Sequence, residues 1–235
     1  MAKARYDQWR QLPTQWVKDG ELKKLTWLAQ GSDAIVALMV FLVMSHKRSL
    51  SSDGSNNSTV QVTYDELQTA LNVSRSKISG GISILLDVGW IKKEASRSHF
   101  TFTAPSVPWG KVPVRPLYDN HNAIFAFDSW RLRNPLELDA LKLYFVLITF
   151  RDSDLNYASI SYERLRHYSG VQKIKSALNF LVASTLIYIE REAPNPYGNQ
   201  NPPNMYRIRG VDSYKHNGTN RDPSRAQDLS QEAPF

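Results

Sequence analysis

Hydroxyl and cationic side chains crowd the start of one predicted helix, at Ser74, Arg75, Ser76 and Lys77, with Ser79 one turn later. An arginine or lysine at the start of a helix can bond the O6 and N7 atoms of guanine in a DNA major groove. Serine hydroxyls and the unpaired N–H groups of a helix start suit phosphate oxygens. Ser74 is also a suitable helix cap, and the two cations suit an ordinary exposed surface, but the pattern around them favours contact with DNA.

The segments around this cluster form a recognisable order of elements. Apolar spacing and capping residues predict a helix from Ser32 to about His46, a short strand at 60–62, and helices at 63–71 and 75–88. Thr63 and Glu66 have the spacing of a capping box. Alternating residues at 90–94 and 99–103 predict a β-hairpin. Helix, strand, helix, tight turn, helix and hairpin is the order of a winged helix-turn-helix domain.

The same order is predicted a second time. The pattern Val62-Thr-Tyr-Asp-Glu-Leu67 recurs as Ile160-Ser-Tyr-Glu-Arg-Leu165, with the tyrosines 98 positions apart, at 64 and 162. That interval is about the size of a small domain. Helices are predicted at 135–151, 162–168 and from Ile174, and wing strands at 186–190 and 204–209. The predicted fold class is therefore α+β, mainly α, with two tandem winged helix-turn-helix domains that carry β-hairpin wings.

The predicted division is an N-terminal arm at 1–31, a first winged-helix domain at 32–103, a proline-rich linker at 104–122, a second winged-helix domain at 123–210 and a disordered tail at 211–235. A strand is expected at 123–127, and the tryptophans of the arm are expected to dock on the first domain. Gly80 and Gly81 each cost a helix about 1 kcal/mol. A close helix crossing is the favoured reason for them, ahead of a close approach of backbone to DNA.

Other candidate DNA contacts lie on the predicted wings and in the second domain. Arg97 would stand at the tip of the first hairpin, where winged helices touch the minor groove or backbone. The second predicted recognition helix lacks the serine and arginine cluster, so the first domain is the better candidate for reading bases. The remaining candidates are Lys92, Lys93, His99, Arg164, Lys173, Lys175, Arg191, Arg207 and Arg209.

Composition favours an anionic partner and disfavours enzymatic chemistry. The net charge is +7, which fits nucleic acid first and an anionic membrane surface second. The chain has no cysteine, so disulfides, thiol chemistry and the sulfur ligands of structural zinc are excluded. Its five histidines are scattered, and no phosphate-binding loop or catalytic grouping is present. We therefore predict no catalytic residues, no metal site, no cofactor and no enzymatic activity.

The longest apolar run is too short to cross a membrane. It covers eleven residues from Ala34 to Met44, whereas a spanning helix needs about 20. Charged and polar residues near the N-terminus leave no room for the apolar core of a signal peptide. The sequence therefore predicts a cytoplasmic protein without a membrane partner.

With this architecture, the chain resembles the tandem winged-helix replication initiators of plasmids. It is also similar to the short helix-turn-helix proteins of bacterial mobile elements. The resemblance lies in the order of modules over 32–209, the helix that opens the second module and the basic hairpin in each half. It implies that the two domains bind repeated double-stranded DNA sites or self-associate as a homodimer.

We therefore expect a double-stranded DNA-binding protein that acts as a replication initiator, a repressor or a partition-type regulator. One alternative is a protein-interaction subunit of a larger nucleoprotein complex, in which the winged helices contact protein partners. RNA binding is a third possibility on charge and tryptophan content, although no RNA-recognition motif is visible.

Overall fold

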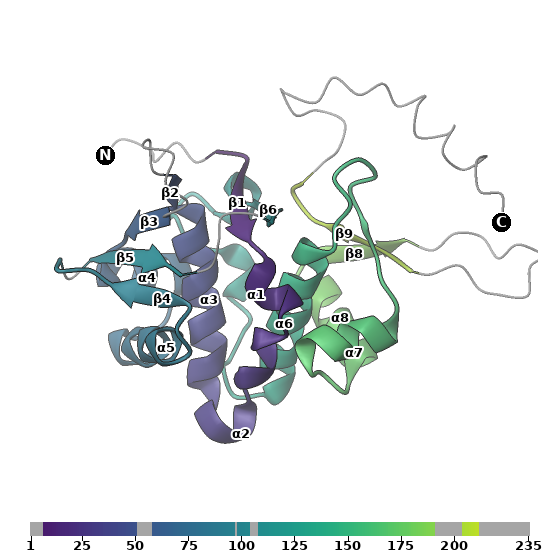
Figure 1. Ribbon diagram of the computed structural model, residues 1–235, viewed down its shortest axis with the longest axis horizontal. Helices are drawn as coiled ribbons and strands as arrows, with labels where there is room; N and C mark the ends of the chain where they lie inside the picture. Colours follow the sequence, from purple (N-terminus) through teal and green to yellow (C-terminus); the bar gives the residue numbers. More distant parts are fainter. Residues whose placement is uncertain (1–6, 51–57, 97, 104–107, 191–203, 212–235) are drawn as a thin grey trace, which may run out of the picture.

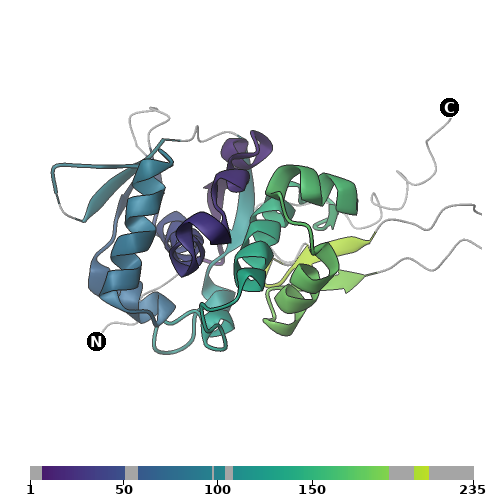
Figure 2. The ribbon, with the colours of Figure 1, turned by 90° about the horizontal axis from the view of Figure 1, so that it is seen from below.

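The computed structural model describes residues 7–50, 58–96, 98–103, 108–190 and 204–211. Over these ranges the protein has an α+β fold that is mainly helical, with small antiparallel sheets beside the helices (Figure 1 and Figure 2). The predicted class is confirmed at this level. Two long helices, α3 (Ser32–His46) and α6 (Pro135–Thr149), run through the middle of the molecule, and the other elements flank them.

The first half follows the predicted order of elements. After α3 come β2 (Ser49–Leu50), β3 (Ser58–Gln61), α4 (Tyr64–Leu71), α5 (Arg75–Asp87), β4 (Ile91–Lys93) and β5 (His99–Phe102). The four strands form an antiparallel sheet in the order β2-β3-β5-β4. The predicted capping box at the start of α4 is present, because the Thr63 hydroxyl accepts a bond from the Glu66 N–H and the Glu66 carboxylate accepts one from the Thr63 N–H at 2.8 Å. This reciprocal pair sets where α4 begins.

The second half repeats the same arrangement. After α6 come β7 (Ala158–Ser159), α7 (Tyr162–Ser169), α8 (Ile174–Ala183), β8 (Ile187–Glu190) and β9 (Met205–Ile208). Its sheet has the order β7-β9-β8, which matches β3-β5-β4 of the first half. A second capping box, between Asn134 and Glu137, starts α6, with Pro135 at the first helical position. The sequence repeat therefore corresponds to a repeat of helices and strand order.

The arm and the predicted linker form a sheet of their own, so the segment expected to be a proline-rich linker, 104–122, contains regular structure. Strand β1 (Trp9–Pro13) pairs antiparallel with β6 (Trp109–Pro113). Pro13 and Pro113 stand at the strand ends, where a missing N–H is tolerated. The arm continues through α1 (Gln15–Lys18), the 3-10 turn η1 (Glu21–Lys24) and α2 (Trp27–Gln30), and the linker through the 3-10 turn η2 (Arg115–Leu117).

Two further expectations at the edges of the second half need correction. The strand predicted at 123–127 is instead a 3-10 turn, η3 (Phe125–Phe127), where the Phe127 ring packs edge-on against Trp130 at 5.1 Å. The predicted tail does not start at 211, because Val211 is buried and its carbonyl accepts a bond from the Asn156 side chain. The rest of the tail, residues 212–235, lies outside the described residues.

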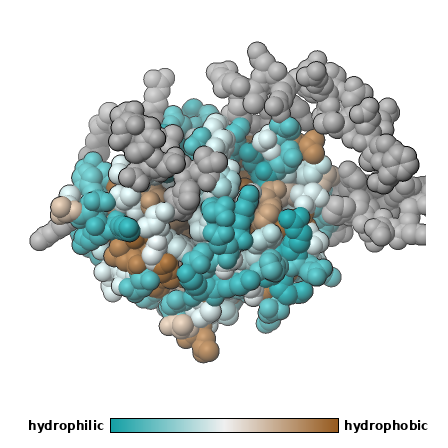
Figure 3. All heavy atoms as spheres, viewed as in Figure 1, coloured by the Kyte–Doolittle hydropathy of each residue, from teal (hydrophilic) through white to brown (hydrophobic). Residues whose placement is uncertain are grey.

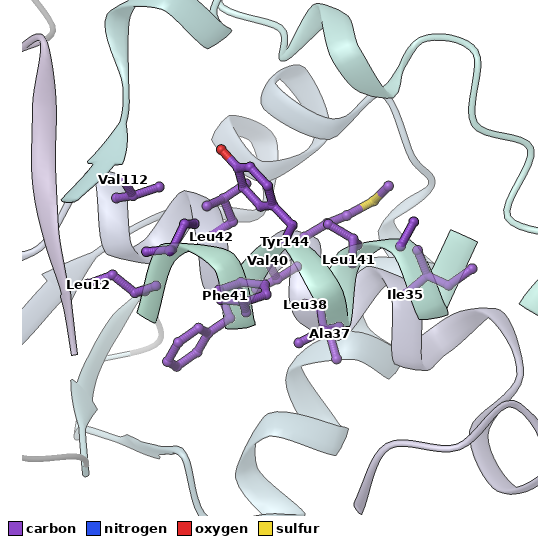
Figure 4. Close-up of a cluster of buried hydrophobic side chains, with 14 of the residues drawn as sticks. Leu12, Ile35, Ala37, Leu38, Val40, Phe41, Leu42, Val112, Leu141 and Tyr144 are labelled. Atoms are coloured by element: carbon purple, nitrogen blue, oxygen red, sulfur yellow. The ribbon is translucent and has the colours of Figure 1, made fainter. Parts of the chain in front are cut away.

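The core lies where α3 meets the other elements. α3 is apolar on all sides, and it is buried from Ala34 to His46 between α5, α6 and β1. In Figure 4, Leu12 and Val112 of the β1–β6 pair lie beside Leu42 of α3, and Tyr144 and Leu141 come from α6. The buried side chains of both halves form one continuous cluster. The division into two domains therefore stays a prediction.

Trp16 in the arm joins the two halves. Its ring lies 4.2 Å from Trp90 and 5.1 Å from Phe41 in the first half, and 5.5 Å from Phe145 in the second, between ring centroids. Its indole N–H donates to the Pro13 carbonyl at 2.7 Å. The arm thus docks on both halves, rather than on the first alone.

The expected close helix crossing at Gly80 and Gly81 is confirmed. A Cβ atom added at Gly81 would lie 2.9 Å from the backbone nitrogen of Ala37 in α3. One added at Gly80 would lie 2.6 Å from a carboxylate oxygen of Asp33, which is a side-chain end and can move. The contact between α3 and α5 offsets the cost of two glycines in a helix.

We expect Gly81→Ala to lower the free energy of unfolding by about 1–3 kcal/mol, because its methyl group would press on the α3 backbone. The matched control is Ser83→Ala on the exposed side of the same helix, which is expected to change stability by less than about 0.5 kcal/mol. Urea denaturation measures both variants. Equal stability of the two variants would contradict the close crossing.

His46 ends α3 inside the protein and is held neutral there. Its Nδ1 lies 2.9 Å from the hydroxyl oxygen of Tyr118, and its Nε2 has no hydrogen-bond partner among the described residues. Burial, reinforced by the positive charge of Arg10, lowers the pKa of His46 to about 3. An unfolded histidine titrates near pH 6.5. Between these two values the unfolded chain binds a proton that the folded chain does not.

Stability should therefore fall as the pH drops below about 6.5, and from pH 7.5 to 5.0 this one group is expected to remove about 2 kcal/mol. His46→Gln is expected to flatten that dependence, and His121→Gln, at an exposed turn, to leave it unchanged. Urea midpoints measured across this pH range test the prediction. A His46→Gln variant with the wild-type slope would show that His46 is not the group responsible.

Candidate nucleic-acid interface

The predicted serine and arginine cluster lies together at the start of α5. The Ser74 side chain accepts a bond from the Lys77 N–H at 3.4 Å, so it caps the helix as the sequence allowed. Ser74, Arg75, Ser76 and Ser79 are all exposed. Because the capping hydroxyl remains at the surface, these groups present hydrogen-bonding atoms on one accessible face.

Arg75 is the cation of this face. Its Nη1 lies 2.8 Å from Oδ1 of Asp65 in α4, and its guanidinium is 5.8 Å from the centre of the Tyr64 ring. Both members of the ion pair are largely exposed, with 63% and 78% of their side-chain surface accessible. Such an exposed ion pair is weak in water, so Arg75 can readily exchange Asp65 for another anion. Asp65 therefore orients Arg75 without burying it.

Lys77 points to a different place from the one its sequence position predicts. Its Nζ lies 2.6 Å from Oγ of Ser32 and 2.8 Å from Oδ1 of Asp33, at the start of α3. The neighbouring Gly80 leaves room for that carboxylate. Lys77 is thus a link between α5 and α3, and Arg75 is the more exposed of these two cations.

The β4–β5 hairpin lies next to α5 (Figure 1) and carries further cations. Lys92 and Lys93 are exposed on β4, whereas His99 on β5 is only partly exposed and its Nδ1 is buried without a hydrogen-bond partner among the described residues. Arg97, predicted at the tip, lies outside the described residues. Lys92 and Lys93 are therefore the exposed cations of this hairpin among the described residues.

The second half presents a plainer helix start. Lys175 is exposed in the first turn of α8, and Lys173 is exposed at the N-cap position without a side-chain cap. Lys173 lies close enough to Asp139 for its charge to oppose the rise that burial causes in the pKa of that carboxyl. Arg164 on α7 is exposed, with its guanidinium 5.1 Å from the centre of the Phe150 ring. Hydrophilic residues predominate at the lower right of the face drawn in Figure 3, beside some apolar ones.

The predicted arginines of the second wing differ in accessibility. Arg207 on β9 is held in place, with its Nε 2.8 Å from Oε2 of Glu190 and its Nη1 bonded to the Leu155 carbonyl at 3.2 Å. Arg209 is exposed. Arg191 lies outside the described residues. Arg207 therefore serves the sheet, and Arg209 is the available cation.

The arm reaches the turn before α8, which the sequence did not indicate. Gly170 forms that turn with a φ of 74°, and a Cβ atom added there would lie 3.3 Å from Cγ of Lys23 in η1. η1 also packs against α7. The start of α8, the second predicted recognition helix, is therefore supported by the arm as well as by α6.

Other site types gain no support from the described residues. Over the ranges that the structure covers, no group of three or more His, Cys, Asp or Glu side chains is placed to hold a metal ion, and no helix is long and apolar enough to cross a membrane. Comparison with protein families, with curated proteins and with solved structures finds no match to this chain.

The position of Lys77 predicts a small coupling between α5 and α3. Lys77→Met and Asp33→Asn are expected to couple by about 0.2–1 kcal/mol in a double-mutant cycle of unfolding free energies, because the pair is partly exposed. The control is a second double-mutant cycle that combines Lys175→Met with Asp33→Asn, because these two residues belong to different halves of the protein. A coupling energy of zero between Lys77 and Asp33 would contradict the contact between their side chains.

Proposed function

We propose that the protein binds double-stranded DNA, and that its two repeated units are winged helix-turn-helix domains. The repeated element order and the matching strand orders β3-β5-β4 and β7-β9-β8 support the domain interpretation. The observation that carries the DNA proposal is the exposed start of α5, where Arg75 and three serines stand beside a hairpin with two lysines. Control of replication, transcription or partition on a bacterial mobile element would each use such binding.

In this proposal α5 enters the major groove. α5 has 13 residues, and a helix with its side chains is about 10–12 Å across, so it fits a major groove about 12 Å wide with its first turn against the base edges. Arg75 exchanges its bond to Asp65 for a guanine, which offers two acceptors to one guanidinium. Ser76 and Ser79 suit bases or phosphates, and Lys92 and Lys93 neutralise phosphates on the flanking backbone.

The second unit would add phosphate contacts at a fixed distance from the first. Its exposed cations, Arg164 and Lys175, suit backbone oxygens. α3 and α6 pack together, and Trp16 lies against both halves. The spacing of the two contacts on DNA would therefore be set by the shared core, rather than by the length of a linker.

A protein-interaction role is the second candidate for the second unit. Val182 at the end of α8 and Tyr188 on the neighbouring β8 are 40% and 41% exposed. Exposed apolar and aromatic side chains suit a protein partner or a second copy better than they suit phosphates. The first unit would then hold DNA, while the second joins a nucleoprotein complex.

To test the DNA proposal, duplexes that the protein binds are selected from a randomised pool. The protein is then titrated into the labelled selected duplex at 50 and 200 mM salt. We expect affinity to fall steeply over this range. Arg75→Gln should lose about 10- to 100-fold in affinity for the selected site, since a bidentate guanine contact is worth about 1–3 kcal/mol. Asp65→Asn should bind more tightly than wild type, because it releases Arg75 and removes a negative charge.

The matched control is Lys18→Gln, which removes one exposed charge from α1 and should weaken binding far less. Lys92→Gln should lower all duplex affinities together and reduce the salt slope by about 1. Two results would overturn the proposal: no selected or bound duplex at 50 mM salt, or equal losses for Arg75→Gln and Lys18→Gln.

A further inference from the structure

The 3-10 turn η1 of the arm contacts both repeated units. Its first residue, Glu21, accepts a bond from the indole N–H of Trp90, in the first half, at 3.4 Å. Two residues later, Cγ of Lys23 would lie 3.3 Å from a Cβ atom added at Gly170, in the second half. η1 also packs against α7, and Figure 2 shows the arm between the two halves. The position of η1 is therefore fixed by both units.

Lys23 combines a packed stem with an accessible charge. The residue is exposed, and its Nζ would lie 3.5 Å from a Cβ atom added at Gly20. Lys23 belongs to no ion pair among the described residues, whereas Lys24 beside it is paired with Glu21. A stem that is already packed loses less conformational freedom when its ammonium group binds an anion. Lys23 is thus the cation of η1 that is available to a phosphate.

The turn between α7 and α8 places further cations beside Lys23. Arg166 lies one helical turn before Gly170, and its carbonyl accepts a bond from the Gly170 N–H at 2.8 Å. Lys173 and Lys175 follow at the start of α8. These three cations are exposed, and within the described part of the chain none of them is in an ion pair. Four exposed cations from two separate segments therefore lie at or beside this turn.

The equivalent segment of the first unit is electrically balanced. Residues 63–77 contain two cations and two acids, so their net charge is zero. Residues 161–175, which lie 98 positions later, contain four cations and one acid, so their net charge is +3. In the first unit both cations are in ion pairs with acids. Attraction for a polyanion is therefore stronger at η1 and the second unit than at the start of α5.

We propose that η1 and the α7–α8 turn form one surface that binds the phosphate backbone of DNA, with Lys23 as the contact from the arm beside Arg166 and Lys175. The inference rests on the proposed DNA binding, and it gives two surfaces different roles. This surface supplies affinity that is independent of sequence, while the start of α5 selects bases. Each cation that neutralises a phosphate releases a counterion, so this surface contributes strongly to the salt dependence of binding.

The test uses a duplex of alternating adenine and thymine, because it offers phosphates but no guanine to Arg75. Its affinity is measured between 50 and 200 mM salt for the wild type, for Lys23→Gln and for the double variant Lys23→Gln/Arg166→Gln. The slope of log affinity against log salt should become shallower by about 1 in the single variant and by about 2 in the double variant. Because both side chains are exposed, the variants should keep the wild-type urea midpoint.

The matched control is Arg115→Gln, which removes an exposed cation from η2 and should keep the wild-type slope. Equal slopes in the wild type, both Lys23 variants and the control would overturn the surface, even where Arg75→Gln still loses affinity for its selected site. Shallower slopes in the Lys23 variants alone would support the surface, even where Arg75→Gln binds its site like the wild type. The two results separate failure of this surface from failure of base reading by α5.

Vesicles that contain phosphatidylserine are the second probe, because an anionic membrane also attracts exposed cations. We expect the duplex to bind at 50 mM salt and to compete with the vesicles for the protein. Binding of the vesicles without binding of the duplex, with weaker vesicle binding in Lys23→Gln, would assign the surface to a membrane and overturn the proposal.

Discussion

The close packing of α3 against α5 on one side and α6 on the other is the constraint on which the rest of the structure depends. α3 has no polar face, so it can exist only where other elements surround it. Gly81 allows the backbones of α3 and α5 to approach, and Trp16 of the arm closes the remaining seam between Phe41 and Phe145. The two repeated units therefore share a core, and any surface that they present has a fixed geometry.

This packing also decides which charged side chains face outward. The approach of α5 to α3 brings Lys77 to Asp33 and leaves Arg75 at the surface beside Asp65. At the other end of α3, Arg48 donates to the Gln11 carbonyl of β1, and no acidic side chain among the described residues pairs with it.

Local signals predicted the repeated elements well. The capping box of Thr63 and Glu66 and the apolar spacing of Ile78 and Ile82 depend on residues three or four apart, so they are visible in the chain. Three features depend on distant contacts and were not visible. β1 pairs with a strand about 100 residues away, Lys77 contacts the start of α3, and the Ile124 N–H donates to the Ala70 carbonyl just before the 3-10 turn that replaces an expected strand.

The most direct measurement of the central claim, that α5 reads DNA bases, is methylation interference at guanine N7 with the wild type and Arg75→Gln. The account predicts that methylation of one guanine in the bound site weakens the wild type, because it blocks an acceptor that Arg75 uses, and leaves Arg75→Gln unaffected. A bound site at which the two proteins show the same interference pattern would contradict the claim.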